Sequence, residues 1–169
     1  LNQDSLFISN EDFKEKVYVA EFFFTSCPSI CPIMNKNMKL IEERYGSRSD
    51  FGIASFTIDP DHDSPSVLKK YAEAYNVFSQ NWHFLTGDKE KLYDLANKGF
   101  NIFASVNPRV EGGFEHQGYF ALIDKKGYIR SRTDQFENPI VYYMGLDQEN
   151  LEVQEFELLI EDIEKLLKE

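Results

Sequence analysis

The sequence contains few residues that bind metals or react covalently. Its 169 residues include only two cysteines, Cys27 and Cys31, and three histidines. A framework of several disulfides is therefore excluded, and a chain of this length can bury a core without one. Any site that depends on thiol chemistry must contain one or both of these cysteines.

Basic residues and long apolar runs are also scarce. Lysine and arginine number 18 against 29 aspartates and glutamates, and the acidic excess is concentrated in residues 147–169. Nucleic acid is not an expected partner, because its binding requires cations that pair with phosphates. No apolar run approaches the roughly 18 residues of a membrane span. We therefore expect a soluble chain.

Strand and helix patterns alternate along the sequence. The predicted strands are 16–25, 51–59 and 82–87, and the predicted helices are 32–45, 65–75, 89–98 and 151–167. Ser64 and Asp88 are expected helix caps, and segments 119–124 and 128–133 predict a β-hairpin. The alternation predicts one α/β domain over residues 1–169, with a central mixed sheet flanked by helices and a C-terminal hairpin and helix.

Three loops are expected at one edge of this sheet. They are the cysteine loop after Thr25, the loop DPDHDSP after Ile58, and the segment before Tyr119. Ligand sites in α/β sheets lie beyond the carboxyl ends of the strands. The order of the elements therefore predicts a site where these loops meet.

The spacing of the two cysteines is compatible with three kinds of chemistry. A helix that begins near Cys31 should lower the thiol pKa values, and Pro28 and Pro32 should stiffen the loop. A structural disulfide would add little, because it would close a very short loop. A redox-active dithiol resembles the strand, cysteine pair and helix of thioredoxin, although with three intervening residues instead of two. Two neighbouring thiolates also suit copper(I) or zinc.

A metal site needs at least one further ligand, and the histidines are the candidates. His116 directly precedes the predicted strand at Tyr119 and follows a Gly-Gly pair that would let the loop bend. His62 lies in a strongly acidic loop that can neutralise it. His83 lies within a short predicted strand, where packing is the simplest role.

Several segments resemble the Sco/SenC family of thioredoxin-fold copper proteins that help to assemble cytochrome c oxidase. These segments are FFFTSCPSICPIMNKNM, FTIDPDHDSP, LTGDKEKLYDLA, and a histidine followed by YFALIDKKG. The resemblance covers nearly the whole chain in order. It implies a thioredoxin-like fold and one copper ion, Cu(I) or Cu(II), per chain, with Cys27, Cys31 and His116 as its ligands.

The chain departs from the family pattern at two places. Glu115 and Gln117 flank the histidine where family members usually have aspartate before it and serine or threonine after it. His62 replaces an arginine in the loop that begins with Asp59. Asp59 is a candidate for a hydrogen bond or a charge that supports the metal ligands, and a purely structural role at the strand end is an equal alternative.

The resemblance also implies a partner and a location. The expected partner is subunit II of cytochrome c oxidase, with other copper chaperones or thioredoxin-like reductants as further candidates. We expect a soluble domain that lacks its native N-terminal membrane anchor. The expected location is the periplasm or outer face of a bacterial cytoplasmic membrane, ahead of the mitochondrial intermembrane space.

Other functions use the same cysteine pair. A thiol-disulfide oxidoreductase would use Cys27 and Cys31 as catalytic residues. A thiol peroxidase would need a cation beside its reactive thiolate, and Arg109 is the candidate for that cation. An interaction module with a structural disulfide would show neither metal binding nor thiol turnover.

Overall fold

A five-stranded sheet lies at the centre of the protein, whose computed structural model describes residues 1–134, 136–147 and 154–169. Its strands are β1 (Val17–Phe23), β2 (Phe51–Thr57), β3 (Trp82–Leu85), β6 (Tyr119–Ile123) and β9 (Tyr142–Met144). The strand order is β3-β2-β1-β6-β9. β1, β2 and β3 run parallel, whereas β6 is antiparallel to both β1 and β9. The predicted mixed sheet is present.

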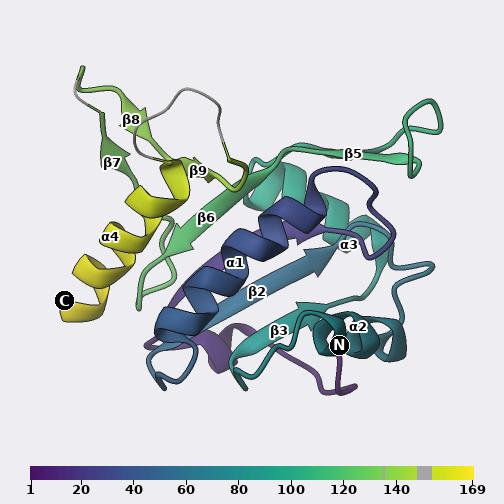
Figure 1. Ribbon diagram of the computed structural model, residues 1–169, viewed down its shortest axis with the longest axis horizontal. Helices are drawn as coiled ribbons and strands as arrows, with labels where there is room; N and C mark the ends of the chain where they lie inside the picture. Colours follow the sequence, from purple (N-terminus) through teal and green to yellow (C-terminus); the bar gives the residue numbers. More distant parts are fainter. Residues whose placement is uncertain (135, 148–153) are drawn as a thin grey trace.

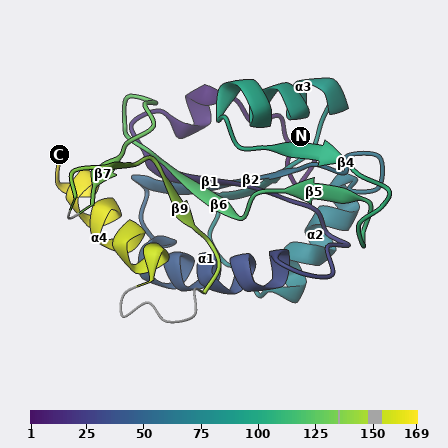
Figure 2. The same cartoon turned by 90° about the horizontal axis from the view of Figure 1, so that it is seen from above.

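Helices cover both faces of this sheet. They are α1 (Cys31–Tyr45), α2 (Pro65–Ala74), α3 (Lys89–Asp94) and α4 (Glu155–Lys168), with a 3₁₀ turn η1 (Asn10–Phe13) and a π-helical turn η2 (Leu95–Gly99). Helices α1, α2 and α4 lie on one face, and α3 and η1 lie on the other (Figures 1 and 2). The cysteines therefore lie where the chain passes from β1 into α1.

Strand β1 packs against both helical layers. On one face, the ring of Phe22 lies 5.7 Å from that of Phe100, which follows η2. On the other face, the ring of Phe23 lies 5.4 Å from that of Tyr71 on α2. Successive side chains of a strand point to opposite faces. A strand buried on both faces explains the nearly continuous apolar run of its sequence.

Two small antiparallel sheets complete the fold. β4 (Ala104–Val106) pairs with β5 (Phe114–His116), and β7 (Arg132–Thr133) pairs with β8 (Pro139–Ile140). Figure 1 shows β5 beside the loop that leads into α1. Gly112 and Gly113 have φ angles of 84° and 80° in the β4–β5 connection, a region that glycine adopts without strain.

The β6 hairpin is shorter than the sequence predicts. After the turn, residue Ile129 forms an isolated bridge with Ile123, and the Arg130 amide donates to the Leu122 carbonyl at 2.8 Å. The remaining edge of β6 is occupied, because residues 119–121 pair with β9. Residues 132–133 therefore pair with β8 instead of continuing along β6.

The helix boundaries also differ in detail from the prediction. Asp88 caps α3 by accepting from the Lys91 amide at 3.0 Å, as predicted, but the helix changes to a π turn after Asp94. Ser64 occupies the N-cap of α2 without a capping side-chain hydrogen bond. Helix α1 begins one residue earlier than predicted, at Cys31. The predicted start of the last helix, residues 151–153, lies outside the described residues.

No helix in the described part of the chain is both long enough and apolar enough to cross a bilayer.

A buried hydrogen bond joins α4 to the sheet and gives a prediction for stability. The Tyr143 hydroxyl on β9 donates to the Asp162 carboxylate at 2.8 Å. We expect Tyr143→Phe to lower the free energy of unfolding by about 1–3 kcal/mol, because it removes a donor from a buried charged acceptor. Urea unfolding measures this change. Tyr128→Phe is the matched control, since that ring is 68% exposed, and an equal loss in both variants would contradict the assignment.

Candidate metal centre

The loop that carries the cysteines is anchored by a buried carboxylate. Asp63, which is 1% exposed, accepts a hydrogen bond from the Thr25 amide at 3.1 Å and another from the Thr25 hydroxyl. It also accepts from the hydroxyl of Thr57 at the end of β2. Three donors satisfy the carboxylate and hold the first residue of the cysteine loop against the neighbouring strand.

The two cysteines are free thiols whose sulfurs lie close together. Cys31 is fully buried as the first residue of α1, and Cys27 is 9% exposed in the loop. The Cys31 amide lies 3.4 Å from the Cys27 sulfur and points out of the helix N-terminus, where it has no partner within the helix. The folding of the loop onto α1 therefore brings the Cys27 sulfur to the Cys31 amide at the start of the helix.

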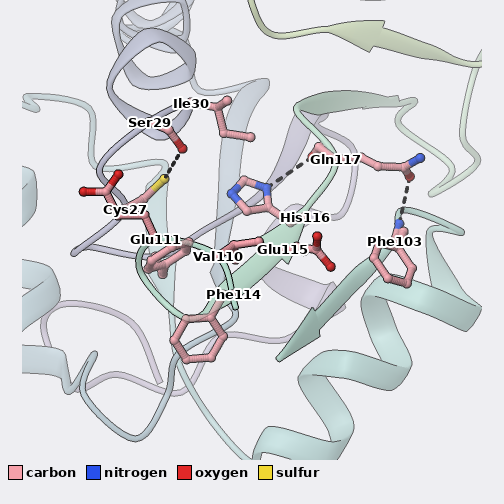
Figure 3. Close-up of a pocket in the computed structure, with 11 residues that line it drawn as sticks. Cys27, Ser29, Ile30, Phe103, Val110, Glu111, Phe114, Glu115, His116 and Gln117 are labelled. Atoms are coloured by element: carbon pink, nitrogen blue, oxygen red, sulfur yellow. Dashed lines mark hydrogen bonds between the residues drawn. The ribbon is translucent and has the colours of Figure 1, made fainter. Parts of the chain in front are cut away.

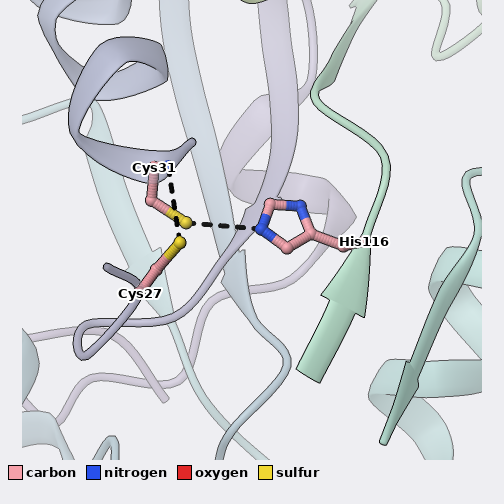
Figure 4. Close-up of side chains that lie close together, drawn as sticks. All are labelled: Cys27, Cys31 and His116. Carbon is pink, nitrogen blue, oxygen red and sulfur yellow. Dashed lines mark hydrogen bonds between the residues drawn. The ribbon is translucent and has the colours of Figure 1, made fainter. Parts of the chain in front are cut away.

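His116 completes a group of three donor atoms (Figure 4). Its Nε2 lies 3.3 Å from the Cys31 sulfur, and the metal-binding atoms of Cys27, Cys31 and His116 all lie within 4.8 Å of one another. Among the described residues, no other group of histidine, cysteine and acidic side chains has this geometry. Residues 85 positions apart thus meet because β5 lies across the end of the sheet.

The backbone fixes the orientation of this imidazole. His116 Nδ1 lies 3.2 Å from the Gln117 carbonyl oxygen, which can only accept a hydrogen bond. A proton on Nδ1 leaves the Nε2 lone pair directed at the cysteines, the arrangement found when a histidine binds a metal. The Gln117 side chain also accepts from the Phe103 amide at 2.9 Å, which ties β5 to the chain before β4.

The two thiols differ in their acidity. A hydrogen bond from the Cys31 thiol strongly lowers the pKa of Cys27, and contacts with His116 and with backbone amides lower it further against the effect of burial. The pKa of Cys31 is raised by its hydrogen bond to Cys27 and by its burial. Cys27 is therefore the more easily deprotonated of the two thiols. Its thiolate is the form that binds a soft metal ion.

An open pocket of about 440 Å³ exposes one side of the centre (Figure 3). Its lining residues are Phe24, Cys27, Ser29, Ile30, Phe103, Val110, Glu111, Phe114, Glu115, His116 and Gln117. Five of these eleven residues are aromatic or aliphatic, and no lysine or arginine is among them. The pocket gives a partner direct access to Cys27 and His116, whereas Cys31 remains buried.

The other candidate residues lie apart from the three donors. The Asp59 carboxylate contacts His62 Nδ1 at 2.8 Å, and no described hydrogen bond joins it to a cysteine or to His116. His62 projects into solvent, and its hydrogen bond and ion pair with Asp59 raise its pKa. His83 packs its ring edge-on against Phe13 at 5.7 Å. Arg109 does not line the pocket.

Two residues that support the centre were not identified from the sequence. Asp63 lies in the loop that was expected near the cysteines, but nothing in the sequence distinguishes it from the other aspartates there. Gln117 acts through its backbone carbonyl, which any residue provides, and through a side-chain contact with Phe103, just before a strand that was not predicted. Both roles depend on tertiary contacts.

These features define a class of protein, namely a thioredoxin-like domain with a Cys₂His group at the carboxyl end of β1. The model of the SCO1/SenC family matches residues 1–149. The chain therefore belongs to the SCO1/SenC family. The predicted family and the predicted thioredoxin-like fold are both confirmed.

Individual relatives agree with this assignment. The SCO1 protein homolog of Bacillus subtilis is 34% identical over 139 residues, which are 81% of this chain and 72% of that protein. A SCO1/SenC family lipoprotein from Bacillus anthracis has a solved structure with a TM-score of 0.79, 30% identity, and coverage of 98% of this chain and 90% of its own. BsSco, described with a disulfide switch, gives a TM-score of 0.75 at 30% identity, with coverage of 98% and 88%.

The anchoring role of Asp63 gives a second prediction. We expect Asp63→Ala to lower the free energy of unfolding by at least about 2 kcal/mol, because it leaves the buried Thr57 hydroxyl and the Thr25 amide without their acceptor. Guanidinium unfolding measures the loss. Asp61→Ala is the control, since Asp61 is exposed and pairs with Lys89 at the surface, and we expect a change within about 0.5 kcal/mol. Equal stability of the two variants would show that Asp63 is not an anchor.

Proposed function

We propose that this protein binds one copper ion per chain through Cys27, Cys31 and His116 and delivers it to the copper A site of cytochrome c oxidase. The observation that carries the proposal is the convergence of two sulfurs and one imidazole nitrogen within 4.8 Å. Soft thiolates select copper(I), and an imidazole suits both oxidation states of copper. Copper is the cargo in this proposal.

Relatives support the choice of copper and of the oxidase. The Sco family is described as one of cytochrome c oxidase assembly proteins in the report on BsSco, a 30% identical protein. Yeast Sco1, which has the same fold at 22% identity and a TM-score of 0.67, has been solved with copper bound. The proposed partner is subunit II of the oxidase, and the proposed location is the outer face of a bacterial cytoplasmic membrane.

The geometry suits transfer as well as binding. The pocket exposes Cys27 and His116, so an incoming thiol or imidazole can bind the ion before the buried Cys31 sulfur releases it. Ligand exchange of this kind leaves the ion coordinated throughout. His116 is the ligand carried by a separate hairpin, β4–β5, and its departure would open the centre without disturbing α1.

Reduction of the partner's thiols is a second candidate function. It is supported by the asymmetric thiol pair, in which Cys27 has a lowered pKa and Cys31 supplies the second sulfur. Attack of the Cys27 thiolate on a partner disulfide would form a mixed disulfide, and attack by Cys31 would release the reduced partner and leave a bridge between Cys27 and Cys31. A thiol peroxidase is disfavoured, because no cation lines the pocket to hold a peroxidatic thiolate.

Histidine substitutions test the proposed ligand set. We expect His116→Ala to weaken copper binding by more than about 100-fold, because losing even a hydrogen-bond partner of a metal ligand costs about 10–100-fold. His62→Ala and His83→Ala are matched controls and should stay within about tenfold of the wild type, equivalent to roughly 1.4 kcal/mol. Titration of reduced protein against a competing Cu(I) chelator measures all three. Equal losses for His116 and His62 would overturn the assignment of the third ligand.

The redox state of the cysteines gives a separate test. Thiolates bind copper(I) and a disulfide does not, so copper should shift the disulfide equilibrium towards the dithiol by its own binding free energy. We expect the measured disulfide potential to become more positive when Cu(I) is present. If the disulfide potential does not change with copper and the protein consumes peroxide catalytically, the assignment as a copper protein is wrong and the protein is a thiol enzyme.

A further inference from the structure

A buried asparagine lies on the inner face of α1, one turn after the metal centre. Asn35 is 1% exposed, and the neighbouring Met34 and Met38 are fully buried in the hydrophobic core. Residues four apart lie on the same side of a helix, so Asn35 follows Cys31 along this face. A polar side chain in such a place lowers stability unless it is hydrogen-bonded. The hydrogen bonds of Asn35 therefore decide what it does.

The side-chain amide nitrogen of Asn35 makes two hydrogen bonds. It donates to the carbonyl oxygen of Cys31 at 2.9 Å and to the hydroxyl of Tyr71 at 2.8 Å. Cys31 is the first residue of α1, and Tyr71 belongs to α2, which lies on the same face of the sheet (Figures 1 and 2). One side chain thus joins the residue that carries a metal-binding sulfur to the neighbouring helix.

The side-chain oxygen of Asn35 is not used in this arrangement. Oδ1 is buried and has no hydrogen-bond partner among the described residues. The opposite orientation of the amide would set this oxygen against the Cys31 carbonyl, where two acceptors repel each other. An unpaired buried acceptor lowers stability, and alanine would avoid that loss and favour the helix more strongly. Such a local cost is typical of residues kept for a functional contact.

The first turn of α1 has few other attachments. Its N-cap residue is Ile30, which makes no capping side-chain hydrogen bond, whereas serine, threonine, aspartate or asparagine would stabilise the turn there. The Cys31 amide lies 3.4 Å from the Cys27 sulfur, and sulfur is a weak acceptor. The bridge from Asn35 to Tyr71 therefore supplies an attachment that the end of the helix otherwise lacks.

Tyr71 is a firm anchor for this bridge. Its ring lies 5.4 Å from that of Phe23 on β1 and 5.9 Å from that of Phe84 on β3. Packing against two strands fixes the hydroxyl relative to the sheet. A continuous series of contacts therefore runs from the sheet through Tyr71 and Asn35 to the backbone of Cys31.

We propose that Asn35 is a positioning residue of the metal centre. By tying the first turn of α1 to Tyr71, it keeps the Cys31 sulfur beside His116 Nε2, 3.3 Å away. Asn35 itself does not touch the metal, because its side chain contacts the Cys31 carbonyl and not the sulfur. The inference rests on the proposed function only where copper binding is the measurement.

The same helix offers a matched control. Asn37 is also 1% exposed, and its side-chain amide nitrogen also makes two hydrogen bonds, to the Gly145 carbonyl and to the Asp147 carboxylate, both at 3.0 Å. Gly145 follows β9, so these bonds lead away from the cysteines. Asn37→Ala therefore removes as many buried hydrogen bonds from α1 as Asn35→Ala does, without releasing the first turn.

Amide hydrogen exchange of the reduced, metal-free protein tests the attachment. The amides of Ile33 and Met34 both donate to the Ile30 carbonyl in the first turn. Asn35→Ala should speed their exchange by about tenfold relative to the amides in the last two turns of α1, the effect of roughly one net hydrogen bond lost. Asn37→Ala should not produce this local difference. Uniform acceleration along α1 in Asn35→Ala, or no acceleration, would overturn the proposal.

A second variant tests the bridge without changing Asn35. Tyr71→Phe removes the hydroxyl and keeps the ring, so the first turn should exchange faster as it does in Asn35→Ala. Tyr93→Phe is the matched control, because the Tyr93 hydroxyl donates to the Ile58 carbonyl at 2.8 Å and not to α1. Wild-type exchange of the first turn in Tyr71→Phe would show that the bridge does not hold it.

Copper binding gives the measurement at the site itself. Asn35→Ala should weaken Cu(I) binding in a chelator competition by about tenfold, the lower end of the range for partners that orient a metal ligand, and Asn37→Ala should keep the wild-type affinity. The thiolate-to-copper absorption band of the Cu(II) form should shift in Asn35→Ala alone, because it reports the geometry of the Cu–S bonds and not the stability of the fold. An unchanged affinity and band in Asn35→Ala would overturn the proposal.

The two kinds of measurement separate this inference from the proposed function. If the wild type binds no copper, the proposed function is wrong, and the exchange of the first turn in the metal-free variants still decides the role of Asn35. If the wild type binds copper and Asn35→Ala matches Asn37→Ala in every measurement, the proposed function stands and Asn35 is not a positioning residue.

Discussion

The hydrogen bonds from Thr25 and Thr57 to the buried Asp63 carboxylate are the constraint on which the rest of the centre depends. They fix the point at which the chain leaves β1, and the loop has only a few residues before α1 begins at Cys31. With its start held on β2 and its end held by the helix, the loop brings Cys27 onto the Cys31 amide. The positions of both sulfurs follow from this attachment.

The third donor comes from an independent part of the chain. The β4–β5 hairpin carries His116 to the cysteines, and the Gln117 carbonyl sets the imidazole with Nε2 towards the sulfurs. Ligands from separate segments are well suited to an ion that must be bound and then passed on, because one of them can move while the others stay in place. A site built entirely on α1 would lack this property.

Regular patterns were sufficient to predict much of the fold. The three parallel strands and the helix after the cysteines follow local apolar periodicity, and Cys27 and Cys31 are the only thiols available. The β4–β5 hairpin was missed because its strands are only three residues long. Strand β9 takes the edge of β6 that the predicted hairpin would have used, and this competition between distant segments leaves no local signal.

The supporting residues were harder to predict for a physical reason. Asp59 and Asp63 lie in the same acidic loop, yet Asp63 holds the cysteine loop and Asp59 contacts the exposed His62. Both aspartates are buried, so their roles depend on which donors each carboxylate meets, and that is set by the path of the loop beside β1.

X-ray absorption spectroscopy of the copper-loaded protein tests the central claim most directly. Cu(I) bound at one equivalent per chain should show two sulfur neighbours and one imidazole nitrogen, and the nitrogen contribution should disappear in His116→Ala while both sulfurs remain. Copper surrounded only by oxygen and nitrogen, or a spectrum unchanged by the loss of His116, would contradict the assignment of Cys27, Cys31 and His116 as a single copper centre.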